Sequence, residues 1–360
     1  MDELYLQRAY ELAARGMGDT WPNPPVGALV VRDGAIVGEG YHHQAGGPHA
    51  ETNALRAAGS KARGAAIYIS LEPCRHTGRT PPCTQELVKA GVARVIAGTR
   101  DPSGRGGADE LRASGIEVVI ANDIAASELI EIFARATDSI RPYVALKMAM
   151  SLDGAVASRP GVQERIGSPE EERYVRELRI AYDAVLVGAA TVRIDDPRLT
   201  VRPPHYRPRE YTRIVACGSA SIPVEGRIFA AAPGYAKTIV LAPAGLRERF
   251  RELHDVAEVL FIGAQDAVTL DLVRAMKQLR ARGLFSILCE GGPTIASGLL
   301  AAGQVDRVYW GIAPRFLRGD RAVPVLSGAE LAGLALRLRF DRVERAGDDV
   351  IISGTCLAES

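Results

Sequence analysis

Three ligand-type side chains on separate segments constrain the first half of this chain more than any other feature. His49 opens a His-Ala-Glu triplet, Cys74 ends a Glu-Pro-Cys triplet and Cys83 ends a Pro-Pro-Cys triplet. One imidazole and two thiolates are the kinds of ligand that suit zinc. The pattern therefore predicts that the three segments converge on a single cation.

Three protein ligands leave a fourth tetrahedral position open for water, as in catalytic rather than structural zinc sites. Zinc lowers the pKa of bound water from about 15.7 to about 7, which gives hydroxide at neutral pH. Glu51, two residues after the histidine, can carry the proton that a leaving amine needs. A His-x-Glu triplet followed by Pro-Cys is the signature of zinc deaminases, although eight residues rather than two separate the cysteines here.

A simpler interpretation exists for each ligand taken alone. A single cysteine or histidine is more often a buried apolar side chain or a core residue than a ligand, but the combination with Glu51 and the flanking prolines favours the metal. His76, between the cysteines, is a rival ligand. Cys217, Cys289 and Cys356 are scattered, and we interpret them as small buried residues.

Composition narrows the class of protein. The 360 residues, 47% hydrophobic and 24% charged, indicate a globular protein of about two domains. Lys plus Arg is 44 and Asp plus Glu is 43, and this balance lacks the basic excess typical of nucleic-acid-binding proteins. No apolar run approaches the roughly 18 residues of a membrane span, and the N-terminus lacks the basic and apolar regions of a signal peptide. We expect no nucleic-acid partner, no membrane association and a cytoplasmic location.

Helical and strand-like segments alternate along the chain, which predicts a layered α/β fold. A helix from about 127 to 137 leads to Arg141-Pro142, where we place the boundary between domains 1–140 and 141–360. In the first domain we expect helices around 6–17, 49–55 and 84–90 and strands at 26–31, 35–40, 65–70 and 92–98. In the second we expect helices at 169–182, 246–254 and 270–281, strands at 143–150, 184–188, 213–216, 238–242, 259–263, 284–290 and 305–311, and a hairpin over 336–357.

The second domain carries weaker signals. No Gly-x-Gly-x-x-Gly follows a strand, so a Rossmann dinucleotide site is unsupported. Residues 290–294, Glu-Gly-Gly-Pro-Thr, follow a strand and open a helix, whose backbone N–H groups could hold a phosphate. Arg179 and Arg202 could fork onto a substrate phosphate. Taken alone, the glycine pair is also an ordinary turn and each arginine an ordinary surface charge.

The sequence resembles the RibD family of bifunctional riboflavin biosynthesis enzymes over nearly its whole length. The matching stretches are Pro-Asn-Pro-Pro-Val-Gly at 22–27, Gly-Tyr-His at 40–42, Gly-Pro-His-Ala-Glu at 47–51, Leu-Glu-Pro-Cys at 71–74, Gly-Arg-Thr-Pro-Pro-Cys at 78–83, Ser-Leu-Asp-Gly at 151–154, Asp-Asp-Pro at 195–197 with Leu199, Thr200 and Arg202, and Glu-Gly-Gly-Pro at 290–293. The resemblance implies a cytidine-deaminase-like α/β/α domain followed by a dihydrofolate-reductase-like α/β domain.

The resemblance also implies two activities. The first domain would remove the 2-amino group of a diaminopyrimidinone ribosyl phosphate with Zn²⁺, and the second would reduce the ribosyl group to ribityl with NADPH. His49, Cys74 and Cys83 would bind zinc, Glu51 would move the proton, and Asn23 and His42 would line the pyrimidine pocket. We also expect a homo-oligomer formed through the reductase domain.

In the reductase domain, the resemblance implies cofactor contacts at Ala149, Arg165, Thr191, Asp195, Gly292, Pro293, Thr294, Ile295, Ala296, Ser297 and Gly298. It implies substrate contacts at Gln163, Arg179, Leu199, Arg202 and Glu290. The chain departs from the family at residues 163–167, where Gln163 and Arg165 stand in place of a Ser-x-Trp motif, and at Cys217, which replaces an aspartate. The stretch Asp-Pro-Ser-Gly at 101–104 replaces Asp-Pro-Asn-Pro.

These departures leave alternatives open. One is a deaminase with a degenerate reductase domain that acts in a related pyrimidine-derived pathway. A nucleic-acid base deaminase would need a basic groove with interleaved aromatic residues, and only 6% of the residues are aromatic. A structural zinc protein would need a fourth protein ligand to close the metal.

Overall fold

The structure, a computed structural model, describes residues 1–78, 80–201, 210–317, 319–328, 331 and 336–357. The chain divides into two compact units, Met1–Asp138 and Ser139–Ser360. Each unit has its own sheet, and the predicted α/β class is confirmed. Arg202 lies outside the described residues. No helix in the described part of the chain has the length and apolar character needed to cross a bilayer.

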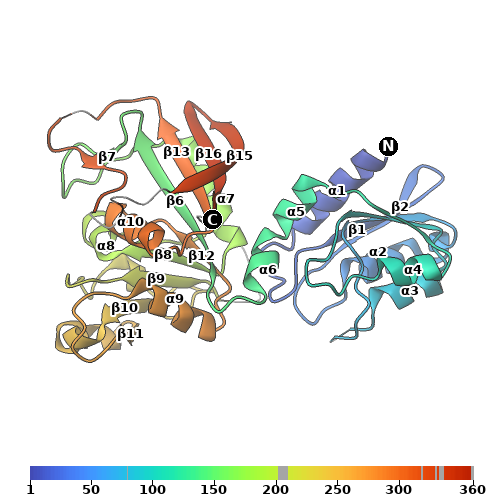
Figure 1. Ribbon diagram of the computed structural model, residues 1–360, viewed down its shortest axis with the longest axis horizontal. Helices are drawn as coiled ribbons and strands as arrows, with labels where there is room; N and C mark the ends of the chain where they lie inside the picture. The colour runs from blue at the N-terminus through green and yellow to red at the C-terminus, as the bar shows by residue number, and fades with distance from the viewer. Residues whose placement is uncertain (79, 202–209, 318, 329–330, 332–335, 358–360) are drawn as a thin grey trace. The chain divides into compact units, whose positions relative to one another are not determined.

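The first unit is a three-layer sandwich around a five-stranded sheet of order β2-β1-β3-β4-β5 (Figure 1). The strands are β1 (Gly27–Arg32), β2 (Ala35–Tyr41), β3 (Ala66–Leu71), β4 (Arg94–Thr99) and β5 (Glu117–Ile120). Apolar residues of α2 (Ala50–Ala58), α3 (Cys83–Ala90) and α4 (Ala108–Ala113) pack on one face of the sheet. Those of α1 (Asp2–Ala14) and α5 (Ile124–Leu129) pack on the other.

Small residues set how closely α2 approaches the sheet. Its inner face is Ala50, Ala54 and Ala58, all buried. A Cβ at Gly38 or Gly40 of β2 would lie within 2.5 Å of the α2 backbone. The glycines therefore allow the helix to pack directly against the strand, which holds the N-terminus of α2 in place at the end of the sheet.

The second unit is built on a nine-stranded sheet of order β11-β10-β9-β8-β12-β6-β13-β16-β15. The seven strands from β11 to β13 in this order run parallel to one another. The next strand, β16, runs antiparallel to β13, and β15 runs antiparallel to β16. The strands are β6 (Tyr143–Ser151), β8 (Ala184–Gly188), β9 (Thr212–Ala216), β10 (Ile239–Pro243), β11 (Glu258–Ile262), β12 (Ser286–Cys289), β13 (Arg307–Ala313), β15 (Arg337–Ala346) and β16 (Asp349–Leu357). A separate short pair joins β7 (Ala155–Ala157) and β14 (Val323–Pro324).

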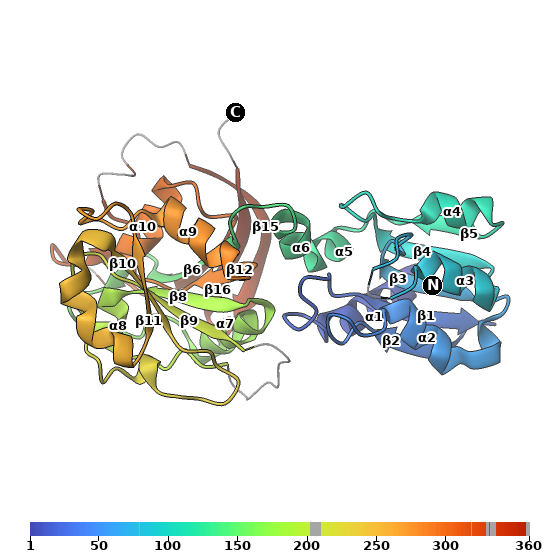
Figure 2. The ribbon, with the colours of Figure 1, turned by 90° about the horizontal axis from the view of Figure 1, so that it is seen from below.

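Helices cover both faces of this sheet (Figure 2). Alternate residues of each central strand belong to different cores, so that Leu186 packs in one and Val185 in the other. The first core includes α9 (Leu272–Ala281) and α10 (Pro293–Ala301), and the second includes α8 (Ala189–Asp195) and the 3-10 segment η3 (Ala244–Asp255). The helix α7 (Pro169–Ala181) lies on the face opposite α9 and α10.

Two predicted helices differ from the structure. The continuous helix expected over 127–137 is wrong: α5 ends at Leu129 and α6 (Glu131–Ala136) begins after a break at Ile130. Ile130 has φ −104° and ψ 7° and is 3% exposed, so the chain leaves helical geometry where it buries this side chain. The helix expected over 246–254 is instead the 3-10 segment η3, interrupted at Leu246.

Candidate active site

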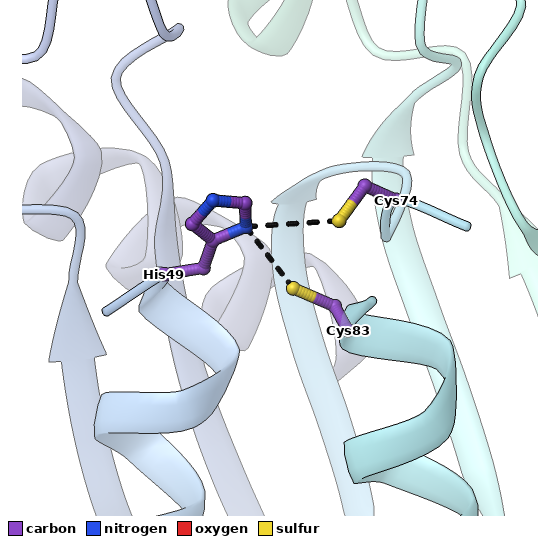
Figure 3. Close-up of side chains that lie close together, drawn as sticks. All are labelled: His49, Cys74 and Cys83. Carbon is purple, nitrogen blue, oxygen red and sulfur yellow. Dashed lines mark hydrogen bonds between the residues drawn. The ribbon is translucent and has the colours of Figure 1, made fainter. Parts of the chain in front are cut away.

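Three elements of the first unit bring the predicted ligands together (Figure 3). His49 is the residue before the first turn of α2, and Cys83 is the first residue of α3. Cys74 lies in the loop that follows β3. The ligand atoms of these three residues all lie within 4.8 Å of one another.

The spacing of these atoms fits zinc. His49 Nδ1 lies 3.2 Å from Cys83 Sγ and 3.7 Å from Cys74 Sγ. Zn–S bonds of about 2.3 Å and Zn–N bonds of about 2.0 Å place tetrahedral N and S ligands about 3.5 Å apart. Among the described residues the group has these three members, and His76, which lines the neighbouring cavity, is not one of them.

The thiols form a pair with unequal acidity. The Cys83 thiol lies in hydrogen-bond contact with Cys74 and stabilises its thiolate, and His49 adds to this effect, so the pKa of Cys74 falls to about 4. The same contact, together with burial, raises the pKa of Cys83. One thiolate is therefore already favoured before any cation is bound, which suits a metal site.

Glu51 is buried beside this group. It lies in the first turn of α2, is 4% exposed and has its carboxyl group against the Cys83 thiol. Burial raises the pKa of Glu51. A carboxyl group whose pKa is shifted toward neutrality is suited to accept and return a proton.

A cavity of about 400 Å³ opens over the ligand group. His49, Glu51 and Cys74 line it, as do Asn23 and His42. Residues from later in the unit complete the lining, namely Asp101, Ser103, Arg105, Phe133 and Thr137. The volume is in the range of small-molecule sites.

A hydrogen-bonded pair forms one wall of this cavity. His42 Nδ1 lies 3.0 Å from the Pro48 carbonyl oxygen, and its Nε2 lies 3.0 Å from Asn23 Nδ2. Burial lowers the pKa of His42, which favours the neutral ring. A neutral ring that donates to Pro48 from Nδ1 accepts from Asn23 at Nε2, and this fixes the orientation of the Asn23 amide.

Thr80 supplies an outer contact to the metal-binding histidine. Its Oγ1 lies 3.2 Å from His49 Nε2, on the ring edge away from the two sulfurs. A hydroxyl oxygen that accepts a hydrogen bond from Nε2–H keeps the proton on Nε2 and leaves Nδ1 free as a ligand. Sequence reasoning assigned no role to Thr80, although it lies in the Gly-Arg-Thr-Pro-Pro-Cys stretch.

We expect Thr80→Val to weaken zinc binding by about 10- to 100-fold, because the ring loses the partner that fixes its tautomer. Competition with a chromophoric chelator measures the affinity. Thr84→Val is the matched control, because the buried Thr84 hydroxyl has no hydrogen-bond partner among the described residues. Equal zinc affinities of the two variants would contradict the role of Thr80.

In the second unit, the candidate cofactor residues gather where the strand order reverses. β8 and β12 are neighbours in the sheet. After β8 the chain continues to β9, toward the β11 edge, whereas after β12 it continues to β13, toward the β15 edge. Ligands of open parallel sheets bind in the crevice at such a switch point, outside the carboxyl ends of the strands. Here the two turns that follow β8 and β12 lie side by side, since a Cβ at Gly291 would be 3.3 Å from the Gly188 nitrogen.

Thr191 and the predicted run Gly292–Gly298 belong to these two turns and their helices. Thr191 lies in α8, and α10 begins directly after Gly292. A Cβ at Gly292 would find Thr191 Oγ1 as its nearest neighbour, at 3.9 Å. No described residue fills the space beside Gly292, and the backbone N–H groups at the start of α10 are a suitable site for a phosphate.

The candidate substrate residues of this unit are linked by one arginine. Arg179 Nε and Nη2 donate to the Glu290 carboxylate at 2.6 and 2.7 Å, and Nη1 donates to the Thr200 carbonyl at 3.0 Å. Leu199, which precedes Thr200, is buried with φ 49°. The Arg179 guanidinium thus forms a bidentate pair with the Glu290 carboxylate, whereas the sequence suggested a substrate phosphate as its partner.

The remaining predicted positions lie on three other segments of this unit. Ala149 is half-buried on β6 and pairs with Gly311 of β13. Asp195 ends α8 and is half-buried, and burial raises its pKa. Gln163 and Arg165 lie in the exposed segment before α7, where Arg165 pairs with Glu172 at 2.5 Å.

Comparison with known proteins covers both units. Residues 1–99 match the family model of the cytidine and deoxycytidylate deaminase zinc-binding region, and residues 142–352 match that of the RibD C-terminal domain. The chain is 40% identical to the riboflavin biosynthesis protein RibD of Escherichia coli and 37% identical to that of Aquifex aeolicus, over 98% of each chain.

The chain belongs to the RibD family.

Solved RibD-type structures agree over the same length. The Acinetobacter baumannii RibD structure covers 99% of both chains at 32% identity with a TM-score of 0.79. A Thermotoga maritima structure, described as a diaminohydroxyphosphoribosylaminopyrimidine deaminase and 5-amino-6-(5-phosphoribosylamino)uracil reductase, gives a TM-score of 0.80 at 32% identity, with 99% of both chains covered. The expected deaminase-like and reductase-like folds are therefore confirmed for this RibD member, which is a bifunctional riboflavin biosynthesis enzyme.

Proposed function

We propose that the first unit catalyses hydrolytic, zinc-dependent deamination of 2,5-diamino-6-(ribosylamino)pyrimidinone 5′-phosphate. The observation that carries this proposal is the convergence of His49, Cys74 and Cys83 beside the buried Glu51 at the base of a 400 Å³ cavity. Three protein ligands are the pattern of a catalytic zinc site. The Thermotoga maritima protein, described as a diaminohydroxyphosphoribosylaminopyrimidine deaminase, supports the same substrate class.

The residues around this site have distinct roles in the proposal. When bound, zinc would act as a Lewis acid that lowers the pKa of a water molecule. The Glu51 carboxylate would accept a proton from the attacking water and return it to the departing amine, so that ammonia leaves as a neutral group. His42 would hold the Asn23 amide in the orientation that hydrogen-bonds the pyrimidine edge.

We propose that the second unit then reduces the ribosyl side chain to ribityl. The NADPH nicotinamide would supply the hydride. The proposed cofactor contacts are Ala149, Arg165, Thr191, Asp195 and Gly292–Gly298, of which the Gly292 and Thr191 turns at the strand switch point are best supported. The proposed substrate contacts are Gln163, Arg179, Leu199, Arg202 and Glu290.

Supplying the diaminopyrimidinone ribosyl phosphate with and without NADPH, and identifying the products by mass, tests both activities. Without NADPH we expect release of ammonia and exchange of an amino group for oxygen. With NADPH we expect a further gain of two hydrogens. Deamination without reduction or NADPH binding would favour a degenerate reductase, an alternative that the full-length similarity to RibD proteins does not favour.

The reductase proposal makes a second prediction at Gly292. Among the described residues, a methyl group there meets no atom closer than Thr191 Oγ1 at 3.9 Å, and the backbone has φ −71°. The Gly292→Ala variant should therefore fold normally, but its added methyl group would project into the space that a cofactor phosphate would occupy. We expect NADPH affinity to fall by about tenfold with deamination unchanged, as measured by fluorescence titration and ammonia release. Unchanged NADPH affinity would place the phosphate elsewhere.

We also propose a homo-oligomer formed through the reductase unit. Its edge strand β15 exposes apolar side chains, with Phe340 63% and Val343 66% exposed. The backbone N–H and C=O groups along the outer side of an edge strand can pair with another chain, and these exposed apolar side chains would be covered in such a contact. Light scattering of the full chain gives the mass, and a monomer at micromolar concentration would overturn this proposal. We place the protein in the cytoplasm, where thiols such as those of Cys74 and Cys83 are kept reduced and remain available to bind zinc.

A further inference from the structure

A second buried carboxylate, Glu72, lies beside the deaminase cavity. It follows the last residue of β3 and precedes Cys74 by two positions. Its side chain belongs to the cavity lining, although the residue is only 8% exposed. In the described part of the chain, the hydrogen-bond partners of Glu72 are backbone N–H groups rather than cationic side chains.

Both oxygens of Glu72 accept backbone hydrogen bonds from one loop. Oε1 accepts from the Ala108 N–H at 2.9 Å, and Oε2 accepts from the Asp101 N–H at 3.2 Å. The carboxylate therefore bridges the two ends of the 101–108 segment. A carboxylate can accept at both oxygens, whereas the amide of a glutamine can accept at only one.

Because Gly106 has no side chain, it leaves room for this carboxylate. A Cβ at Gly106 would lie 2.2 Å from the carboxyl carbon of Glu72. Gly106 also forms a β-bridge with Cys74, and the Gly107 N–H donates to the Pro73 carbonyl at 2.8 Å. The segment that carries the metal ligand and the 101–108 segment are thus joined by backbone contacts on one side and by the Glu72 carboxylate on the other.

The 101–108 segment forms a wall of the cavity. Asp101, Ser103 and Arg105 line the cavity, and Asp101 Oδ1 accepts from both the N–H and the hydroxyl of Ser103. We infer that Glu72 is a positioning residue that holds this wall at a set distance from Cys74 and so determines how the substrate lies against the metal site. Proton transfer stays with Glu51, because Glu51 is the carboxyl group that lies against the Cys83 thiol.

This inference rests on the proposed deaminase function and is tested with Glu72→Gln in the full-length protein. The substitution keeps the shape but places an NH₂ group against a backbone N–H, so one end of the wall is released. We expect KM for the diaminopyrimidinone ribosyl phosphate to rise by about tenfold, kcat to stay within about threefold, and zinc content to remain one per chain. Glu110→Gln, an exposed glutamate of α4, is the matched control.

Gly106→Ala provides an independent variant, since its methyl group displaces the same carboxylate. We expect a similar rise in KM, and an effect in the double variant smaller than the product of the two single effects because both act on one contact. Hydrogen exchange at the Asp101 and Ala108 amides should accelerate in each variant, and this readout does not depend on turnover.

The outcomes separate the two proposals. If the unsubstituted protein releases no ammonia, the proposed function fails, and faster exchange at Asp101 and Ala108 in Glu72→Gln still supports the role of Glu72 in holding the 101–108 segment. A loss of kcat with unchanged KM would assign Glu72 to the chemistry and overturn the inference. Loss of zinc, or exchange and KM equal to those of Glu110→Gln, would also overturn it.

Discussion

Glu51→Gln is expected to reduce the deamination rate by about 10²- to 10⁴-fold, the range of general acid–base catalysis. The carboxamide is nearly isosteric but cannot accept and return a proton. Glu51 is buried within α2 and lies against Cys83 rather than belonging to the three-residue ligand group, so zinc should stay bound. Ammonia release and metal analysis on the same preparation measure both quantities.

The reductase provides the internal control for this variant. The two units have separate sheets and separate cores, so reduction of the deaminated substrate by NADPH should be unaffected. Glu110→Gln, which makes the same chemical change at an exposed site, should retain full deamination. Near-normal turnover in Glu51→Gln would show that another group moves the proton.

Cys74→Ser is expected to give the second largest effect, with loss of most bound zinc and of deamination together. A serine hydroxyl is a much poorer zinc ligand than a thiolate, and the pKa of Cys74 near 4 shows that this position favours the thiolate. The first unit should also become less stable when the metal is absent, because metal binding contributes to folding. Metal content by atomic emission and thermal unfolding with and without added zinc test both effects.

Cys356→Ser is the control for this variant, because Cys356 lies on β16 of the second unit and is half-buried. It should bind zinc normally and retain deamination. Full zinc occupancy in Cys74→Ser would remove Cys74 from the ligand set and leave the site to His49, Cys83 and an unrecognised ligand.

The sequence was most informative where chemistry depends on residue type and short spacing. The ligands His49, Cys74 and Cys83 and the neighbouring Glu51 form a set that residue type and order alone make recognisable, because few functions need this combination. The β8 strand was predicted at its observed bounds, since a central parallel strand is a continuous apolar run. Breaks in helices were harder to predict from the sequence. The break at Ile130 depends on where its apolar side chain is buried, which is decided by tertiary packing.

Other features depended on contacts between residues distant in the chain. The pairing of Arg179 with Glu290 joins residues 111 positions apart, and no periodicity in the sequence reports it. The tertiary structure also decided which nitrogen of His49 faces the sulfurs, because Thr80 occupies the other side of the ring. The sequence alone thus determined which atoms are available for zinc and proton transfer, since these follow from residue identity. The tertiary structure decided how those atoms are oriented and what surrounds them, since burial and hydrogen bonding arise only when separate segments pack together.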